Sequence, residues 1–203
     1  MEKTRFIREK YNRNSKFYNL FEFPIEFFLY KHWRKKLFDK VKGSMILEVG
    51  VGTGKNFKFY NNNRIIGIDI SEGMLSRAKL AAREKGIRLI QMDAQKLAFF
   101  DNTFDTVVST FVFCSVPDPV KGLKEIKRIL NPKSQVLFIE HVLPKNRIIG
   151  WVFNKLNPII RSLTGVNINR KTVENICSAG FKIIKQENLF FSIFKFITAK
   201  PLK

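Results

Sequence analysis

Short apolar runs alternate with amphipathic segments from residue 44 to the end of the chain. The runs predict strands at 45–49, 64–70, 89–92, 103–110, 136–142, 182–189 and 192–199. The segments 71–85, 118–130 and 170–179 predict helices, and Asn131-Pro132 is expected to close the second. Repeated strand–helix units favour an α/β protein with a doubly wound, mostly parallel seven-stranded sheet, in which the last two strands form an antiparallel hairpin.

Two segments fall outside this alternation. Residues 1–43 precede the first strand and predict a helical extension over a domain that spans 44–203. Residues 145–169 lie between the fifth strand and the last helix and predict an insertion. No repeat or linker divides the chain, so we expect one domain with these two additions.

Composition places the chain among globular proteins. It has 203 residues, 45% of them hydrophobic, and only two cysteines, Cys114 and Cys177, both in apolar stretches. We therefore expect two buried thiols in a reducing compartment. No apolar run approaches the ~20 residues of a membrane-spanning helix, and the first residues lack the hydrophobic region of a signal peptide. A cytoplasmic protein, free or peripheral on the inner face of a membrane, is the expectation.

Positive charge is concentrated at both ends of the chain. The net charge is +20, made up of +7 in residues 1–42, +1 in 43–120 and +12 in 121–203. Such a field favours a polyanionic surface, either nucleic acid or anionic lipid. A compositional bias of the source is the alternative, and the charge alone does not decide between them.

A glycine-rich loop follows the first predicted strand. It reads Glu48-Val49-Gly50-Val51-Gly52-Thr53-Gly54. Glycines let the backbone turn tightly and approach a ligand closely, and the helix start beyond them offers free N–H groups. The third glycine is one position short of the dinucleotide-binding spacing, and Lys55 is outside the P-loop frame. The loop therefore predicts a ligand site of another kind.

With its acidic partners, this loop resembles that of class I S-adenosylmethionine-dependent methyltransferases. Asp69 ends the second strand, where a carboxylate would accept both ribose hydroxyls, and Asp93 ends the third, where the adenine amino group would be bound. A helix-cap neighbour and a turn residue are the structural alternatives for these two acids. Phe104-Asp105-Thr106-Val107-Val108 resembles the fourth strand of the family, and Asp105 is expected to be structural.

The resemblance implies a Rossmann-like fold, S-adenosylmethionine as methyl donor and no metal. Its implied cofactor-binding residues are Tyr11, Tyr18, Glu48, Gly50, Gly52, Gly54, Asp69, Ile70, Met74, Asp93, Ala94, Ser109 and Thr110. Tyr11 and Tyr18 belong to an N-terminal segment that folds over the cofactor in similar proteins.

Two residues are candidates for catalysis. His141 follows Glu140 at the end of the fifth strand and is expected to face the crevice as a general base, although a histidine bonded to backbone there is an equal alternative. Tyr18 is the second candidate. His32 stands in a basic stretch and is expected at the surface.

The acceptor class follows from the segments after the fourth strand. Ser109 to Cys114 lacks the Asn/Asp-Pro-Pro-Tyr/Phe sequence of enzymes that methylate base amines. The run from Ser115 to Pro132 resembles ubiquinone and menaquinone methyltransferases, bacterial phospholipid N-methyltransferases and membrane-associated thiol methyltransferases. The resemblance covers residues 44–142 and implies a hydrophobic, membrane-associated acceptor: a phospholipid amine, a quinone precursor or a thiol.

Both flanks interleave aromatic and aliphatic residues with Lys and Arg. Residues 17–38 and 148–163 therefore fit interfacial segments on anionic lipid, or else they pack over the acceptor pocket as core, with 145–169 on the acceptor side. An RNA methyltransferase, or an RNA-binding protein of this fold, is the alternative and predicts salt-dependent RNA affinity. The Phe and Ile content of the flanks favours the lipid acceptor over nucleic acid.

Overall fold

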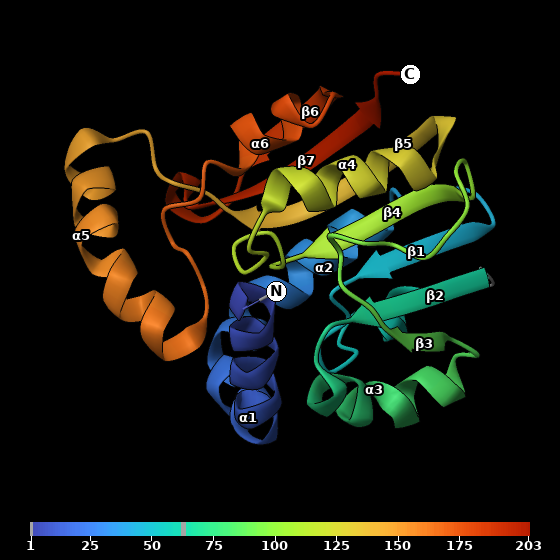
Figure 1. Ribbon diagram of the computed structural model, residues 1–203, viewed down its shortest axis with the longest axis horizontal. Helices are drawn as coiled ribbons and strands as arrows, with labels where there is room; N and C mark the ends of the chain where they lie inside the picture. The colour runs from blue at the N-terminus through green and yellow to red at the C-terminus, as the bar shows by residue number, and fades with distance from the viewer. Residues whose placement is uncertain (1, 62–63) are drawn as a thin grey trace.

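The computed structural model describes residues 2–61 and 64–203, and only the backbone of residues 17–25, 27 and 28. One seven-stranded sheet runs through it in the order β3-β2-β1-β4-β5-β7-β6 (Figure 1). The strands are β1 Met45–Val49, β2 Arg64–Asp69, β3 Arg88–Gln91, β4 Phe104–Thr110, β5 Leu130–His141, β6 Phe181–Asn188 and β7 Phe194–Pro201. Strands β1 to β5 pair in parallel, whereas β7 is antiparallel to both β5 and β6. This confirms the predicted sheet and its C-terminal hairpin.

The helices connect these strands and extend the chain at its N-terminus. They are α1 Glu2–Ile25, α2 Lys31–Phe38, α3 Glu72–Glu84, α4 Pro119–Ile129, α5 Arg147–Thr164 and α6 Thr172–Ser178, with a π-helical turn η1 at Glu26–Tyr30 and short 3-10 turns η2 at Phe57–Phe59 and η3 at Phe190–Ser192. Side-chain caps begin three of them. Ser71 accepts from Met74 N at 3.1 Å before α3, Asp118 accepts from Lys121 N at 3.0 Å before α4, and Asn146 accepts from Ile148 N at 3.0 Å before α5. The predicted helices are present to within a few residues.

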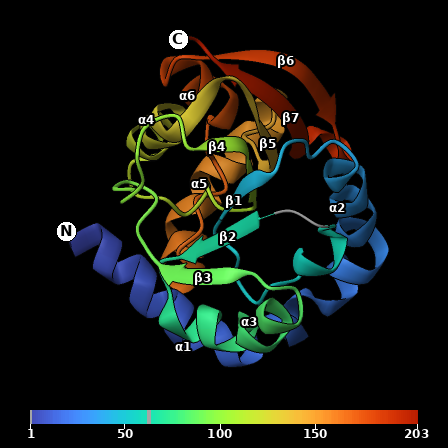
Figure 2. The same ribbon diagram turned by 90° about the vertical axis from the view of Figure 1, so that its right-hand side faces the viewer.

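Helices cover both faces of the sheet, as the continuous apolar strands require. Val107 and Val108 in β4 point to opposite faces and are both fully buried. On one face Val107 belongs to a cluster with Leu123 of α4, and α6 packs on the same side. On the other face Val108 belongs to a cluster with Leu37 of α2 and residues of α3. Figure 2 shows the twisted sheet between the two layers.

The start of β5 differs from the sequence prediction. Helix α4 ends at Ile129, but Asn131-Pro132 does not form a break, because β5 already begins at Leu130. The pairing with β4 shifts there, from Phe104↔Leu130 to Thr106↔Gln135, so residues 131–134 form an irregular bulge that accommodates proline.

Asp105 has the structural place expected for it. Its Oδ2 accepts from Met45 N at 3.0 Å and Ser44 N at 2.9 Å, and its Oδ1 accepts from Asn131 Nδ2 at 3.0 Å. These bonds, led by that from Met45, lower the pKa of Asp105. The carboxylate joins the starts of β1 and β5 and lies far along the strands from their carboxyl ends.

Helix α2 packs against the sheet rather than remaining exposed. Trp33, Arg34, Leu37 and Phe38 are buried, so the expectation of an interfacial segment is wrong for this part of residues 17–38, and Arg34 in particular is 5% exposed. His32 is exposed, as expected.

The cysteine prediction is half right. Cys114 is buried, but Cys177 is exposed. Cys177 falls on the outer side of α6, whose inner residue Ile176 reaches the core. The apolar residues around Cys177 in the sequence do not indicate which side of the short helix α6 is buried.

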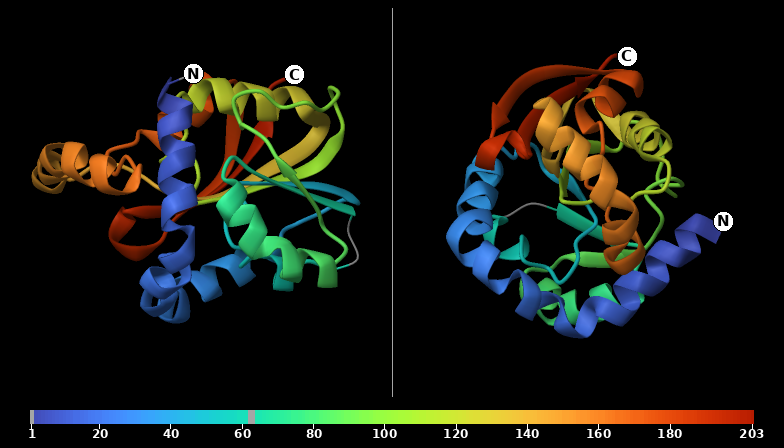
Figure 3. Two further views of the ribbon diagram at one scale, coloured as in Figure 1. Left: turned by 60° about the horizontal axis from the view of Figure 1, so that its bottom comes forward. Right: turned by 90° about the vertical axis from the view of Figure 1, so that its left-hand side faces the viewer.

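Helices α1 and α5 lie beyond the carboxyl ends of the parallel strands. Figure 3 shows α1 crossing this end of the sheet and α5 standing away from the body of the molecule. No helix in the described part of the chain combines the length and hydrophobicity needed to cross a membrane.

Candidate active site

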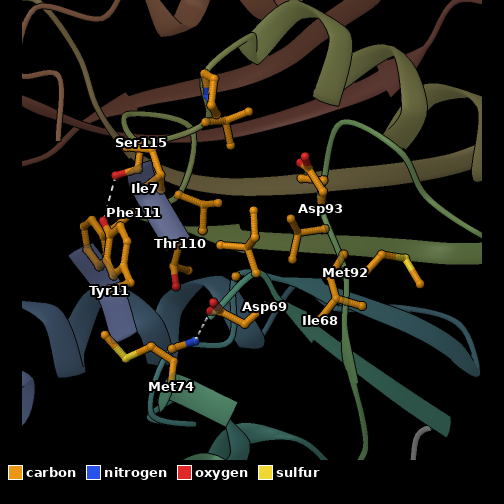
Figure 4. Close-up of a pocket in the computed structure, with 18 residues that line it drawn as sticks. Ile7, Tyr11, Ile68, Asp69, Met74, Met92, Asp93, Thr110, Phe111 and Ser115 are labelled. Carbon is orange, nitrogen blue, oxygen red and sulfur yellow. Dashed lines mark hydrogen bonds between the residues drawn. The ribbon is translucent and has the colours of Figure 1, made fainter. Parts of the chain in front are cut away.

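A pocket opens at the carboxyl ends of β1, β2, β3 and β4 and is covered by α1 (Figure 4). It holds about 690 Å³ of unfilled space, including the part open to solvent. Nine of the expected residues line it: Tyr11, Gly50, Gly52, Asp69, Ile70, Met74, Asp93, Ala94 and Thr110. The site therefore lies where an open α/β sheet binds its ligands.

The glycine loop forms one wall of the pocket. Gly50 N donates to Ile68 O at 2.8 Å, which fixes the loop to β2. Gly52 has a φ of +54°, and a Cβ placed on it would meet no atom within 4 Å, so this position faces open space. At Gly54, which does not line the pocket, a Cβ would come within 2.7 Å of the Phe57 ring. Gly54 thus serves packing rather than direct ligand contact.

Asp69 sits at the centre of the pocket. Its Oδ2 accepts from Gly52 N (Figure 4) and its Oδ1 accepts from Ser71 N, both at 2.9 Å. Burial raises the pKa of Asp69, and the bonds from Ser71 and Gly52 oppose that rise. Each carboxylate oxygen has a further lone pair, so the pair of oxygens can accept two neighbouring hydroxyls.

Asp93 faces the same pocket from the end of β3. Gln95 Nε2 donates to its Oδ1 at 2.9 Å and its Oδ2 at 3.0 Å. Gln95 also accepts from Asp118 N at 3.0 Å and donates to Thr4 Oγ1 at 3.2 Å. Sequence reasoning missed Gln95, which orients Asp93 and ties α1 to the start of α4.

Helix α1 is fixed over the pocket by polar contacts. Asn12 Oδ1 accepts from Ser71 Oγ at 2.7 Å and from Gly73 N at 3.1 Å. Tyr11 Oη and Ser115 Oγ are 2.7 Å apart and share a hydrogen bond. Tyr18 belongs to the same helix, but its side chain is outside the described residues.

Glu48 lies behind the glycine loop rather than in the pocket lining. Its Oε1 accepts from Asn56 Nδ2 at 2.7 Å, and burial raises the pKa of Glu48 to about 7. Arg34 Nη1 donates to Asn56 Oδ1 at 2.6 Å and to Thr110 Oγ1 at 3.0 Å. Of this network, only Thr110 reaches the pocket, so Glu48 is positioned to support the loop.

Ser109 also points away from the pocket. Its Oγ donates to Glu140 Oε1 at 3.2 Å, and Glu140 accepts as well from Val112 N at 3.0 Å and Phe113 N at 3.2 Å. Burial raises the pKa of Glu140 to about 7. This carboxyl group, which the sequence did not single out, holds the loop after β4, where Phe111 adopts a φ of +61° and lines the pocket.

His141 is not among the residues that line the pocket, contrary to its expected orientation. Its ring stacks on Phe153 of α5, with centroids 5.6 Å apart, and meets Phe194 of β7 edge-on at 5.2 Å. Burial lowers the pKa of His141 to about 4, so the imidazole is neutral at physiological pH. The geometry is that of a packing contact between the sheet and α5.

The pocket combines an apolar lining with carboxylates that can accept hydrogen bonds from hydroxyl and amino groups. Asp69 and Asp93 supply the carboxylates, and sequence reasoning did not anticipate the apolar contributions of Ile7, Phe111 and Val116. No group of three or more metal-binding side chains occurs among residues 2–61 and 64–203 as described. The two carboxylates of the pocket can accept hydrogen bonds from hydroxyl and amino groups of a ligand.

Family comparison gives the same class. Residues 47–138 match the family described as methyltransferase domain, and this region of the chain is a class I S-adenosylmethionine-dependent methyltransferase domain. S-adenosylmethionine is the methyl donor of this family. Asp69 and Asp93 both line the pocket, and the open face at Gly52 leaves room for a ligand against the loop.

Among curated proteins, the chain is 40% identical to a phosphatidylethanolamine N-methyltransferase of Cereibacter sphaeroides over 105 residues, covering 49% of this chain and 52% of the relative. It is 36% identical to a demethylmenaquinone methyltransferase of Lactobacillus johnsonii over 152 residues, covering 68% and 62%. The chain therefore spans about half to three fifths of the length of these relatives.

Solved structures agree on the fold. A chain in the complex between the Haloferax volcanii Trm112 methyltransferase activator and its methyltransferase aligns with a TM-score of 0.74 at 17% identity, covering 94% of this chain and 97% of that chain. At this identity the likeness establishes the architecture and leaves the acceptor open.

Proposed function

We propose that this protein transfers a methyl group from S-adenosylmethionine to an amphipathic lipid acceptor held in an anionic membrane. The observation that carries the proposal is the outward-facing apolar stripe of α5, at the same end of the sheet as the pocket. The two relatives named above, whose names specify a phospholipid and a quinone precursor as acceptors, support an acceptor of this class.

The stripe of α5 consists of five aliphatic residues that share one helix face. They are Ile148, Val152, Leu156, Ile159 and Leu163, spaced by four, four, three and four positions. All five are exposed, with Ile148, Ile159 and Leu163 at 76%, 60% and 65%. A contiguous apolar patch of this kind on a helix indicates an interaction with another apolar phase.

The opposite face of α5 holds the helix to the protein. Asn157 Oδ1 accepts from Ile168 N at 2.9 Å, and Asn154 Oδ1 accepts from Asn169 Nδ2 at 3.0 Å. Phe153 stacks on His141. The side of α5 that faces the chain thus holds Phe153, Asn157 and the half-buried Ile160, whereas the aliphatic stripe faces outward. An ordinary surface helix buries such a stripe.

Charge identifies the phase that this stripe meets. Helix α5 carries Arg147, Lys155 and Arg161 and no acidic residue, within a segment of net charge +12. Cations beside an apolar stripe match the interface of an anionic bilayer, because the aliphatic side chains insert into the bilayer and the anionic headgroups attract the basic residues. RNA would use the cations but leave five aliphatic side chains in water.

The pocket residues have defined tasks in such a reaction. When bound, S-adenosylmethionine supplies a methyl group made electrophilic by the sulfonium. Asp69 and Asp93 orient the donor, and α1 with Ile7 and Tyr11 covers the site and excludes water. The apolar lining also disfavours a charged ammonium, so an acceptor amine is held in its neutral, nucleophilic form.

Methyl transfer to vesicles tests the proposal. The protein is incubated with methyl-labelled S-adenosylmethionine and vesicles of phosphatidylethanolamine mixed with phosphatidylglycerol, and label in the lipid extract is counted. Matched incubations replace the acceptor by a demethylated quinone in the same vesicles, or the vesicles by RNA. Label in a lipid fraction is expected; label in RNA, or in neither, would reject the lipid acceptor.

Variants of α5 test the docking surface. The double change Ile159→Ser and Leu163→Ser removes two side chains that are roughly two-thirds exposed, so vesicle affinity is expected to fall by about 2–4 kcal/mol. Leu80→Ser is the control, because Leu80 is 71% exposed on α3, away from α5. Co-sedimentation should weaken in the first variant alone, and equal binding by both would contradict the role of the stripe.

A further inference from the structure

A second cavity adjoins the pocket on the side of α5. It holds about 510 Å³ of unfilled space, including the part open to solvent. Three cationic side chains line it from different parts of the chain: Lys3 from α1, Arg161 from α5 and Arg170 from the loop before α6. No acidic residue is among its lining residues.

Arg170 is held in place by neutral partners. Its Nη2 donates to Val116 O at 2.6 Å and its Nε to Cys114 O at 3.4 Å. Carbonyl groups orient a guanidinium without cancelling its charge. Burial, and then the charge of the neighbouring Arg161, lower the pKa of Arg170.

The positive charge of this cavity is not matched by acids. Within the described part of the chain, no carboxylate forms an ion pair with Lys3, Arg161 or Arg170. Asp118 acts on Arg170 from a distance, but it is exposed and caps α4. Two arginines facing one cavity without a counter-ion indicate that an anion completes the site.

The cavity is continuous with the methyl-transfer pocket. Ile7, Ser115 and Pro117 line both, and the hydrogen bond between Ser115 and Tyr11 lies at their boundary. A single acceptor can therefore place an anionic group in one and its reactive atom in the other. Because Arg161 lies on α5, the cavity also adjoins the helix that carries the apolar stripe.

We infer that this cavity binds the phosphate group of the acceptor, so that the substrate is a phosphate-bearing lipid. The inference rests on the proposed function and narrows its acceptor. A phosphatidylethanolamine headgroup carries its amine a short two-carbon chain away from a phosphodiester, which suits two adjoining cavities. An uncharged quinol precursor has no group for the cationic one. Lys3, Arg161 and Arg170 are then the residues that select the acceptor.

Direct binding tests this without relying on turnover. Glycerophosphoethanolamine, the headgroup without acyl chains, is titrated into the protein by calorimetry at low ionic strength, beside inorganic phosphate and free ethanolamine. Arg161→Gln and Arg170→Gln remove one cation each. Arg83→Gln is the matched control, because it removes the same charge from an exposed position on α3 and does not line the cavity.

The wild-type protein and Arg83→Gln should bind glycerophosphoethanolamine equally, and ethanolamine should not bind. Arg161→Gln should weaken headgroup binding about tenfold or more. Lys3→Gln should weaken it as well, which keeps the test decisive if Arg170→Gln does not fold. Binding of inorganic phosphate alone, or headgroup binding unchanged in Arg161→Gln, would overturn the inference.

Kinetics separate this inference from the proposed function. With phosphatidylethanolamine in neutral detergent micelles, Arg161→Gln should raise KM about tenfold with little change in kcat. Methylation by Arg161→Gln with an unchanged KM would reject the phosphate site but would still support the proposed lipid methyltransferase. Headgroup binding without methylation of any lipid would reject the proposed function and leave the binding site intact.

Discussion

Replacing Asp69 by Asn tests whether this carboxylate anchors the methyl donor. Asp69 accepts two backbone N–H groups at 2.9 Å and faces the pocket with its remaining lone pairs. Asparagine keeps the shape, but one oxygen becomes an NH₂ group that cannot accept from a ligand hydroxyl. The loss of one charge-assisted bond to the ligand is worth about 1.5–3 kcal/mol, or roughly 10- to 150-fold in affinity.

The assay is calorimetric titration of S-adenosylmethionine into folded Asp69→Asn. The matched control is Asp105→Asn, because Asp105 also accepts two backbone N–H groups, from Ser44 and Met45, but lies outside the pocket. The control should lower the stability of the protein and leave donor affinity unchanged. Wild-type affinity in Asp69→Asn, or an equal loss in both variants, would refute the assignment.

Five further variants, at four positions, probe the glycine loop and the residues around the site. Gly52→Ala should lower the free energy of unfolding by about 1 kcal/mol and weaken donor binding, because its methyl group enters the open space of the pocket. Gly54→Ala should lower the free energy of unfolding by roughly 2–4 kcal/mol, because its Cβ would come within 2.7 Å of Phe57. Denaturation and donor titration of both variants check this, and a larger loss of stability in Gly52→Ala than in Gly54→Ala would contradict it. Burial raises the pKa of Glu140 from 4.5 to about 7, so the folded state binds the extra proton and unfolding free energy falls as pH rises through that window. Glu140→Gln lacks this titration, so its free energy of unfolding relative to that of the wild type should rise by on the order of 1–3 kcal/mol between pH 5 and 8. An equal change of unfolding free energy with pH in both proteins would argue against this. His141→Phe should keep both turnover and the packing of α5 against the sheet, whereas His141→Ala should make α5 more sensitive to protease. A folded His141→Phe variant without activity would instead indicate that His141 is a general base.

The strands and the glycine loop could be predicted because their signals are local. Continuous apolar runs mark buried parallel strands, and the order of Gly52, Asp69 and Asp93 along the chain matches their arrangement at successive strand ends. Nine of the expected ligand-binding residues line the pocket for this reason.

Other features depend on contacts between distant segments. Gln95 and Glu140 are ordinary polar residues in sequence, and only the fold brings Gln95 to Asp93 and Glu140 to the loop after β4. Arg34 reads as part of a basic surface stretch, yet α2 turns it toward Asn56 and Thr110. The sequence of residues 148–163 likewise does not indicate which helix face packs against the protein. In the structure Asn157 and Phe153 make that contact.

The most direct test of the whole account is the identity of the methylated product. Labelled S-adenosylmethionine is incubated with the protein and a total lipid extract, and the labelled species are separated and identified by mass spectrometry, with Asp69→Asn as the control for donor binding. The account predicts label in a phosphate-bearing lipid, with little in the control. Label confined to a quinone would contradict the phosphate site, and the absence of any labelled lipid would contradict the central claim.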